Sequence, residues 1–375
     1  MAIEWNKINR LISGVANEQE KAEIAEWASK SHSRQKFLKD AVKFYSSEDD
    51  LNITFDDVNK AWRNTNPIIR TRKRYLKRAI PVAAASLLLI FSILLFTDRT
   101  GRQELPLIEP GTERAKLFLA DGRDVNLGKD TKELSAKLPV KQKVENKKTT
   151  LTIDVKNRAS AQLLEYNEII VPRYAEYQIN LEDGTKVWLN SETKLKFPLV
   201  FGEKERTVYV EGEAYFQVSH NPDKPFIVNI DENTKVKVLG TEFNIRTYES
   251  NVSQSTLISG SIEFIHKGLV TKVSPGESCS LDKASGTVSV ENADIMRVVA
   301  WKNGEFVFRN ETLENIINEL SRWYKVDVSF ENDQVKNERF YLYFDRSAGF
   351  EEIIYKLHKT GKIKYEYKNR KIIIS

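Results

Sequence analysis

The 375-residue sequence contains few of the side chains that build covalent or metal-linked structure. Its one cysteine, Cys279, excludes an intramolecular disulfide, so each domain must be held together by its own apolar core. Cys279 lies in the segment Gly276–Ser280, which does not resemble a nucleophile-bearing turn, and we interpret it as a strand residue. The four histidines are scattered and give no metal-ligand spacing: His32, His220, His266 and His358. We expect no metal site and no cofactor.

Sequence motifs of common enzymes are also missing. There is no phosphate-binding loop, dinucleotide-binding glycine motif, zinc-protease helix, serine-hydrolase elbow or paired CxxC. Glu211, Glu213 and Glu242 could supply a carboxylate pair for sugar hydrolysis, but Glu211 and Glu213 alternate with apolar neighbours, which favours a solvated sheet face. We predict a protein that is not an enzyme. Two alternatives stay open: an anchored hydrolase, and a glycan-binding module that stacks Trp188 and Trp301 on sugar rings.

One long apolar run stands out against this background. Residues 79–97 contain no charged side chain, and a helix needs about 20 such residues to cross the hydrocarbon core of a membrane. We therefore predict a transmembrane helix over 79–97. A cleaved signal peptide is disfavoured because 78 residues precede the run and look folded.

The charges around this run predict its orientation. Only Arg99 and Arg102 follow it closely, whereas six basic residues precede it: Arg70, Arg72, Lys73, Arg74, Lys77 and Arg78. This asymmetry predicts an inner-membrane protein with its N-terminus in the cytoplasm and its C-terminus in the periplasm. Residues 79–375 carry 42 basic and 42 acidic side chains. The net charge of +5 therefore comes from the basic cluster before the apolar run, which we interpret as a signal of membrane orientation. We expect no direct contact with nucleic acid.

Residues 1–69 have the spacing of a small all-α bundle. Asn17 followed by Glu20 predicts a helix start, Ser33 predicts a second, and Thr54 predicts a third. A unit of this size has a marginal core and can depend on a partner protein. Its large apolar side chains either pack inside the bundle or bind that partner, and the candidate contact residues are Ile24, Trp27, Phe37, Leu38 and Trp62.

The pattern changes to alternating apolar and polar residues beyond the apolar run. Residues 206–219 and 235–248 alternate in this way, and turn signals recur about every ten residues, which predicts an all-β domain of sandwich type. Gly240 is expected at a bulge or a close backbone approach. The segments 117–128 and 179–190 echo each other, with Asp121-Gly122 aligned to Asp183-Gly184, and each predicts a strand, a tight turn and a strand.

The last 75 residues mix both periodicities. Strand patterns flank a helix that Asn310 could cap and a second helix near Ser347, in the order β-α-β, β-α-β-β of a small α+β domain. Its strand edges would suit docking of another strand. The complete domain prediction is a helical bundle, a basic juxtamembrane segment, a transmembrane helix, a β-rich domain and a C-terminal α+β domain, over residues 1–69, 70–78, 79–97, 98–300 and 301–375.

Several long motifs resemble the FecR-type membrane anti-sigma factors, in the form common in Bacteroidetes. These motifs occur in order and are Leu181–Val228, Val236–Tyr248, Ser274–Ser278 and Trp301–Val328. The sequence departs from the family at Tyr174 and Ala175, where a glycine-rich step is usual. The last motif resembles the C-terminal domain that accompanies FecR.

The resemblance implies a transmembrane regulator with two protein partners. The cytoplasmic bundle would bind a sigma factor of the extracytoplasmic-function type. The periplasmic part would receive a signal from the signalling domain of a TonB-dependent outer-membrane transducer. The bundle resembles the family only in position, length and helical character, so no sigma-contact residue is carried over from it.

Overall fold

The computed structural model describes residues 5–12, 15–30, 32–46, 108–128, 140–145, 148–153, 165–249, 251–368 and 371–375. The chain divides into two compact units. The larger comprises residues 109–326 and 336–350, and the smaller comprises the described residues up to 108 with 327–335 and 351–375. Each unit is described by itself.

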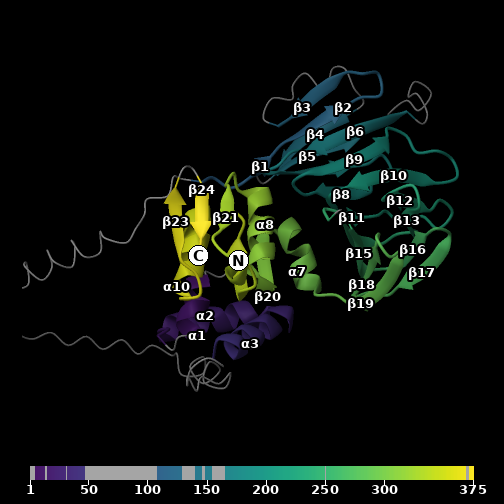
Figure 1. Ribbon diagram of the computed structural model, residues 1–375. Helices are drawn as coiled ribbons and strands as arrows, with labels where there is room; N and C mark the ends of the chain where they lie inside the picture. Colours follow the sequence, from purple (N-terminus) through teal and green to yellow (C-terminus); the bar gives the residue numbers. More distant parts are fainter. Residues whose placement is uncertain are drawn as a thin grey trace, which may run out of the picture. The chain divides into compact units, whose positions relative to one another are not determined.

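The larger unit is built on a β-sandwich of two sheets (Figure 1). Sheet I has the strand order β19 (Thr287–Asn292), β18 (Glu277–Asp282), β15 (Val252–Ser259), β14 (Glu242–Arg246), β11 (Glu213–Gln217), β8 (Lys186–Leu189), β7 (Ala175–Asn180), β5 (Lys148–Ile153) and β4 (Val140–Glu145), with β1 (Thr112–Glu113) beside β7. Sheet II has the order β17 (Leu269–Val273), β16 (Ile262–His266), β13 (Thr234–Val238), β12 (Phe226–Asn229), β10 (Arg206–Glu211), β9 (Thr193–Pro198), β6 (Tyr166–Val171), β2 (Ala115–Phe118) and β3 (Asp124–Leu127).

The core lies between the two sheets because each strand turns alternate side chains inward. In β7 every second residue from Ala175 onward is buried. Phe216 of β11 stacks on Phe243 of β14 with ring centroids 5.0 Å apart, and Phe226 of sheet II packs against Phe216 at 6.2 Å. One continuous apolar cluster therefore joins both sheets.

Glycines stand where the chain passes from one sheet to the other. Gly212, between β10 and β11, has φ +107°, and a Cβ there would lie 2.6 Å from the Thr193 hydroxyl. Gly240, between β13 and β14, would place a Cβ 2.5 Å from Nδ1 of His220. The close approach predicted at Gly240 is confirmed, since a larger side chain would collide with the neighbouring backbone.

The internal echo corresponds to two equivalent hairpins, β2–β3 and β7–β8. Gly122 and Gly184 have φ +87° and +85°. The amides of both glycines donate 3.0 Å hydrogen bonds to the carbonyl oxygens of Leu119 and Leu181, three residues earlier in each copy. The predicted strand, tight turn and strand are confirmed in both copies, and the two hairpins belong to different sheets.

Further elements complete the larger unit: α7 (Ile295–Ala300), the 3₁₀ turn η3 (Trp301–Asn303), β20 (Glu305–Thr312), α8 (Leu313–Trp323) and β22 (Arg339–Asp345). Strands β20 and β22 pair antiparallel, with a register shift between Phe308 and Glu311. Asn310 lies in this shift at φ +48° and does not cap the helix. Thr312 is the cap, since its hydroxyl accepts a 3.4 Å hydrogen bond from the amide of Asn315. The predicted Asn310 cap is wrong because the strand continues past it.

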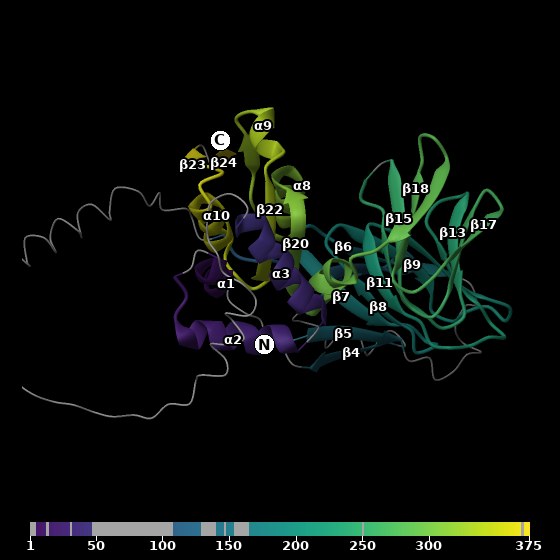
Figure 2. The same ribbon diagram turned by 90° about the horizontal axis from the view of Figure 1, so that it is seen from below.

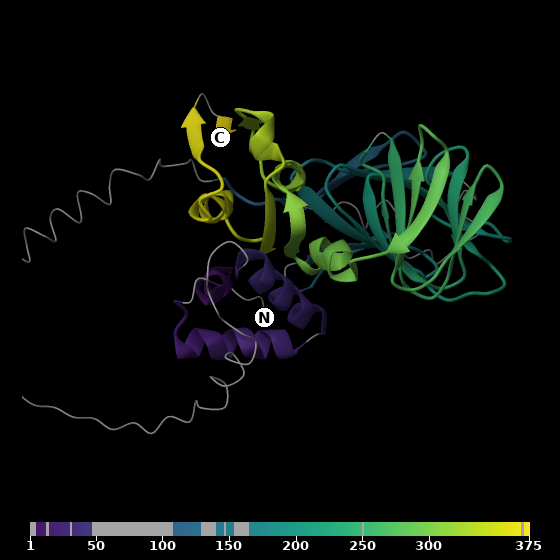
Figure 3. The ribbon, with the colours of Figure 1, turned by 60° about the horizontal axis from the view of Figure 1, so that its bottom comes forward.

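The smaller unit contains three short helices, α1 (Trp5–Ile12), α2 (Glu18–Ser29) and α3 (His32–Ser46), which pack together (purple in Figure 3). The start predicted at Asn17 is confirmed: its side chain accepts a 2.9 Å hydrogen bond from the Glu20 amide, and the Glu20 carboxylate accepts one from the Asn17 amide. Helix α3 begins one residue before the predicted Ser33. The unit also contains a sheet of order β21 (Val328–Phe330), β24 (Lys371–Ile374) and β23 (Tyr365–Lys368), with α9 (Asp333–Lys336) and α10 (Phe350–Lys359).

These observations correct the predicted fold class, which is wrong. The described part of the chain is mostly β-sheet, and α1, α2 and α3 have only 8, 12 and 15 residues. None of the described helices has the length and apolarity needed to cross a membrane. The predicted span 79–97, the basic cluster 70–78, and Thr54 and Trp62 of the predicted third helix lie outside the described residues.

The C-terminal strands also pair differently from the prediction of one small sheet. Strands β20 and β22 pair with each other in the larger unit, while β21, β23 and β24 form a separate sheet. Periodicity locates strands, but it does not state which strands become neighbours.

Candidate functional site

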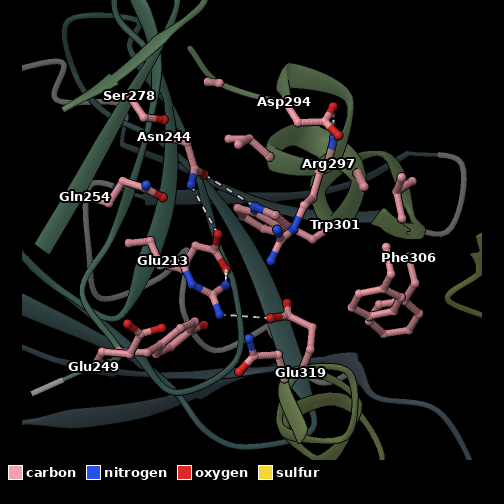
Figure 4. Close-up of a pocket in the computed structure, with 18 of the residues that line it drawn as sticks. Glu213, Asn244, Glu249, Gln254, Ser278, Asp294, Arg297, Trp301, Phe306 and Glu319 are labelled. Atoms are coloured by element: carbon pink, nitrogen blue, oxygen red, sulfur yellow. Dashed lines mark hydrogen bonds and ion pairs between the residues drawn. The ribbon is translucent and has the colours of Figure 1, made fainter. Parts of the chain in front are cut away.

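A polar cavity of about 480 Å³ lies against the outer face of sheet I, under the segment that contains α7, β20 and α8 (Figure 4). Sheet I contributes Asn244, Gln254 and Ser278, and the covering segment contributes Arg297 and Glu319 among others. Arg246 lines the cavity, and Arg346 donates a hydrogen bond to the carbonyl of Trp301, which also lines it. We call Arg246 and Arg346, with their partners Glu213, Glu319, Glu176 and Asn190, the arginine joint.

Arg246 of β14 bridges two carboxylates. Its Nη1 lies 3.1 Å from Glu213 on β11, and its Nη2 lies 2.9 Å from Glu319 on α8. Glu213 also accepts hydrogen bonds from the side-chain amides of Asn190, at 2.9 Å, and Asn244, at 3.1 Å. A guanidinium fork suits this bridging role because its donors are fixed in one plane.

Burial and charge act in opposite directions on the two carboxylates. Glu213 is only 3% exposed, and burial raises its pKa above the ordinary value, although Arg246 acts against this. Burial also acts to raise the pKa of Glu319, but the positive charges of Arg246 and Arg322 outweigh it and lower that pKa overall. Folding therefore makes ionisation of the more deeply buried carboxyl, Glu213, less favourable.

Arg346, which follows β22, makes the reciprocal connection. Its guanidinium donates to the Asn190 side chain at 3.1 Å and to the Trp301 carbonyl at 3.1 Å, and lies 3.4 Å from Glu176. It also lies 3.8 Å from the ring centroid of Trp323, so it is enclosed by an aromatic face. Each side of the joint thus contributes one arginine to acceptors on the other.

Backbone contacts close the joint around α8. The Tyr174 amide donates a 2.8 Å hydrogen bond to the Arg322 carbonyl, and Tyr174 itself has φ +62°. This is the position where the sequence departs from the glycine-rich step of the family it resembles. Gly111 packs directly on Trp323, since a Cβ there would lie 2.6 Å from the indole. Backbone hydrogen bonding and close packing therefore join α8 to the sandwich.

The raised pKa of Glu213 gives a testable pH dependence. A carboxyl with a raised folded-state pKa contributes stability that is complete below its unfolded value of 4.5 and is lost as the pH rises toward the folded value. Glu213→Gln cannot ionise and lacks this loss. We therefore expect the free energy of unfolding of Glu213→Gln, minus that of wild type, to increase from about pH 4 to about pH 7, so that the variant becomes relatively more stable.

Urea unfolding at several pH values measures this difference. The matched control is Glu211→Gln, whose carboxylate is exposed and pairs with Lys194 at 2.9 Å. A stability difference for Glu213→Gln that is flat or falls with pH would contradict the assignment.

The structure separates the three glutamates considered for hydrolysis. Glu211 is exposed on sheet II, and Glu242 accepts hydrogen bonds from Tyr215 and Gln217. Of the three, only Glu213 lines the cavity. The expectation of a solvated face at Glu213 is wrong: its strand turns it to the outer face of sheet I, where residues of α7 and α8 cover it.

The tryptophans proposed for sugar stacking, Trp188 and Trp301, contact other side chains of the chain. Trp301 is 5% exposed, and its indole N–H donates to Asn244 at 3.3 Å. Trp188 meets Tyr215 edge to face, and the Lys302 ammonium lies 4.7 Å from its ring centroid. Neither arrangement resembles an open platform for a sugar ring.

Cys279 is buried in a strand, and His266 and His358 make hydrogen bonds within the fold. Cys279 is fully buried in β18, and burial raises the pKa of its thiol to about 11. His266 shares a 2.9 Å hydrogen bond with Thr234, and His358 lies 2.9 Å from the Ile363 carbonyl. Within the described ranges no cluster of metal-ligating side chains is found.

Four of the five candidate sigma-contact residues lie in the interior of the helical cluster. Ile24, Trp27, Phe37 and Leu38 are between 0% and 4% exposed, and Trp27 meets Phe37 edge to face at 6.3 Å. Their part in binding stays a prediction, and their burial indicates that they would act by holding the helices together. Val15, which is 62% exposed, is an apolar surface residue that the sequence pattern did not single out.

Comparison with protein families matches two segments of the chain, and each contains one arginine of the joint. The family model described as FecR protein matches residues 167–263, and that described as FecR, C-terminal matches residues 305–374. Both segments of the chain therefore match models of FecR domains. Arg246 lies in the FecR segment and Arg346 in the C-terminal segment, so the arginine joint connects the two matched regions.

Two solved structures resemble part of this chain. Crystal structures of a "putative anti-sigma factor" from Parabacteroides distasonis, at 1.65 Å and 2.50 Å resolution, match with 28% identity and a TM-score of 0.50. The match covers 56% of this chain and 98% of the crystallised chain. No curated protein matched in a sequence search.

Proposed function

We propose that this chain is a sigma-factor regulator. The observation that carries the proposal is the ordered pair of FecR matches, together with the structural likeness to a protein described as an anti-sigma factor. The arginine joint is consistent with a regulatory role, because its charged groups connect the two matched regions.

The finer proposal names the partners. We propose that α1, α2 and α3 bind a sigma factor of the extracytoplasmic-function type, and that the β-rich and C-terminal regions receive a signal from a TonB-dependent outer-membrane transducer. The resemblance of the sequence motifs supports both partners. Strands β21 and β23 are the outer strands of their sheet, and such edges can accept a strand of the transducer's signalling domain.

Localisation at the inner membrane, with the N-terminus in the cytoplasm, stays a prediction from the basic cluster and the apolar run. Reporter fusions after Asn66 and after Ser375 test it. The two fusions should report opposite compartments, and reports from the same compartment would contradict the predicted localisation.

Co-purification tests the sigma-binding proposal. The full chain should retain the sigma factor encoded beside it when both are produced in the same cells. Trp27→Ala should abolish this association and also lower helical circular dichroism, because truncating a buried indole costs about 3–5 kcal/mol. Val15→Ser is the matched surface variant, which should weaken binding with the helical signal unchanged.

The two variants separate folding from contact. Unchanged sigma binding by Val15→Ser would remove Val15 from the proposed interface. If the wild-type chain never retains a sigma factor, the proposed function itself is wrong.

A further inference from the structure

Exposed apolar side chains gather at one end of the β-sandwich. The described part of the chain has six large apolar residues that are exposed, and three of them lie on β17 and β19. Leu269 is 76% exposed, Val270 is 55% exposed and Val290 is 38% exposed. Strand β17 is the last strand of sheet II, and β19 is the last strand of sheet I. The apolar surface therefore coincides with two edges that have no further neighbour among the strands that the structure describes.

Both edges are regular, and neither contains a bulge or a proline. The β16–β17 pairing runs from Ile262 opposite Val273 to His266 opposite Leu269 with no register shift, and the β18–β19 pairing is equally regular. Neither β17 nor β19 contains proline. Edge strands commonly carry bulges, prolines or charges that block pairing, and here the charges are one lysine and one glutamate.

The two edges lie at the same end of the sandwich. Strand β17 ends at Val273 and β18 begins at Glu277, so three residues connect sheet II to the last hairpin of sheet I. Strands β17 and β18 contact each other, and Figures 1 and 2 show both at the same end of the sandwich. A two-fold axis at this end that brings β17 of one copy beside β19 of a second copy also brings β19 of the first beside β17 of the second.

The charges of the two edges are opposite. Lys267 and Lys272 are exposed at β17, and Glu291 is exposed on β19. Pairing β17 with β17 would bring lysines together, and pairing β19 with β19 would bring glutamates together. Pairing β17 with β19 instead brings Lys272 near Glu291.

We propose that two copies of this chain associate through this end of the sandwich, with β17 of each copy pairing with β19 of the other. The exposed Leu269, Val270 and Val290 side chains become covered in the dimer. The unpaired backbone groups of both edges gain hydrogen-bond partners. This association is separate from sigma binding, which involves the N-terminal helices.

Charge reversal in the full-length chain tests the proposal. Two differently tagged copies are produced together, and the fraction that co-purifies is measured. Lys272→Glu or Glu291→Lys alone should lower this fraction by about tenfold, because each change places like charges at both junctions of the dimer. The double variant Lys272→Glu/Glu291→Lys reverses both signs and should restore association. Lys235→Glu, at an exposed lysine of the interior strand β13, is the matched control and should change nothing.

Disulfide trapping distinguishes the pairing. A Lys272→Cys copy mixed with a Glu291→Cys copy should cross-link on mild oxidation, while the buried native Cys279 stays unreactive. Cross-linking of Lys272→Cys with itself at equal yield would overturn the β17–β19 arrangement. Wild-type copies that do not co-purify, or single reversals that leave association unchanged, would overturn the dimer.

Discussion

Replacing Arg206 by alanine should destabilise the β-sandwich by about 3–5 kcal/mol, because the Asp183 carboxylate loses its buried cation and the Ser219 and Lys224 carbonyl groups lose their guanidinium donor. Arg206 is 1% exposed. Its Nη1 lies 2.7 Å from Asp183 and donates to the Ser219 carbonyl at 2.7 Å, and its Nε donates to the Lys224 carbonyl at 2.9 Å. One side chain thus holds the β7–β8 turn against the start of β10.

Urea unfolding of the full chain, followed by tryptophan fluorescence, measures the loss. Lys194→Ala is the matched control, since the Lys194–Glu211 pair has side chains that are 45% and 70% exposed and its removal should cost about 1 kcal/mol or less. Arg206→Lys should fall between the two, because one ammonium cannot reach all of the acceptors. A loss for Arg206→Ala no larger than that of the control would show that this buried ion pair does not stabilise the sandwich.

Replacing Arg246 by alanine should have a loss of similar size, about 3–5 kcal/mol, because the buried Glu213 then loses its cation, while Glu319 keeps its ion pair with Arg322. The same change should loosen the contact of α8 with sheet I. Limited proteolysis should therefore cut residues 294–323 faster than in wild type, and this readout separates a loosened joint from a general loss of stability.

A double variant provides the internal check. Glu213→Gln added to Arg246→Ala removes one uncompensated charge, so the double variant should be more stable than Arg246→Ala alone, with a coupling of about 1–3 kcal/mol. Purely additive losses would mean that Arg246 and Glu213 do not stabilise each other. Proteolysis of 294–323 unchanged in Arg246→Ala would contradict its role in holding α8.

Most local elements of the fold could be predicted from the order of the residues alone. The Asn17–Glu20 helix start, the alternating strands and the paired Asp-Gly turns are confirmed, because side-chain spacing and turn chemistry act over a few residues. The motifs of the FecR family were recognisable for the same reason, since contiguous stretches carry them. Gly240 was correctly placed at a close approach because a glycine inside a strand pattern usually marks a bulge or a site where another part of the backbone comes near.

The positions of the buried charges and the pairing of the last strands depend on contacts that form only in the folded chain. Glu213 alternates like a surface residue, and it is buried because α7 and α8, more than 80 residues later in the chain, cover its face of sheet I. Arg246 and Glu319 are 73 residues apart, and Arg346 and Asn190 are 156 apart, so no local pattern connects them. The same limit explains the error in the C-terminal fold: strand positions follow from local periodicity, but the partner of each strand depends on contacts between distant segments.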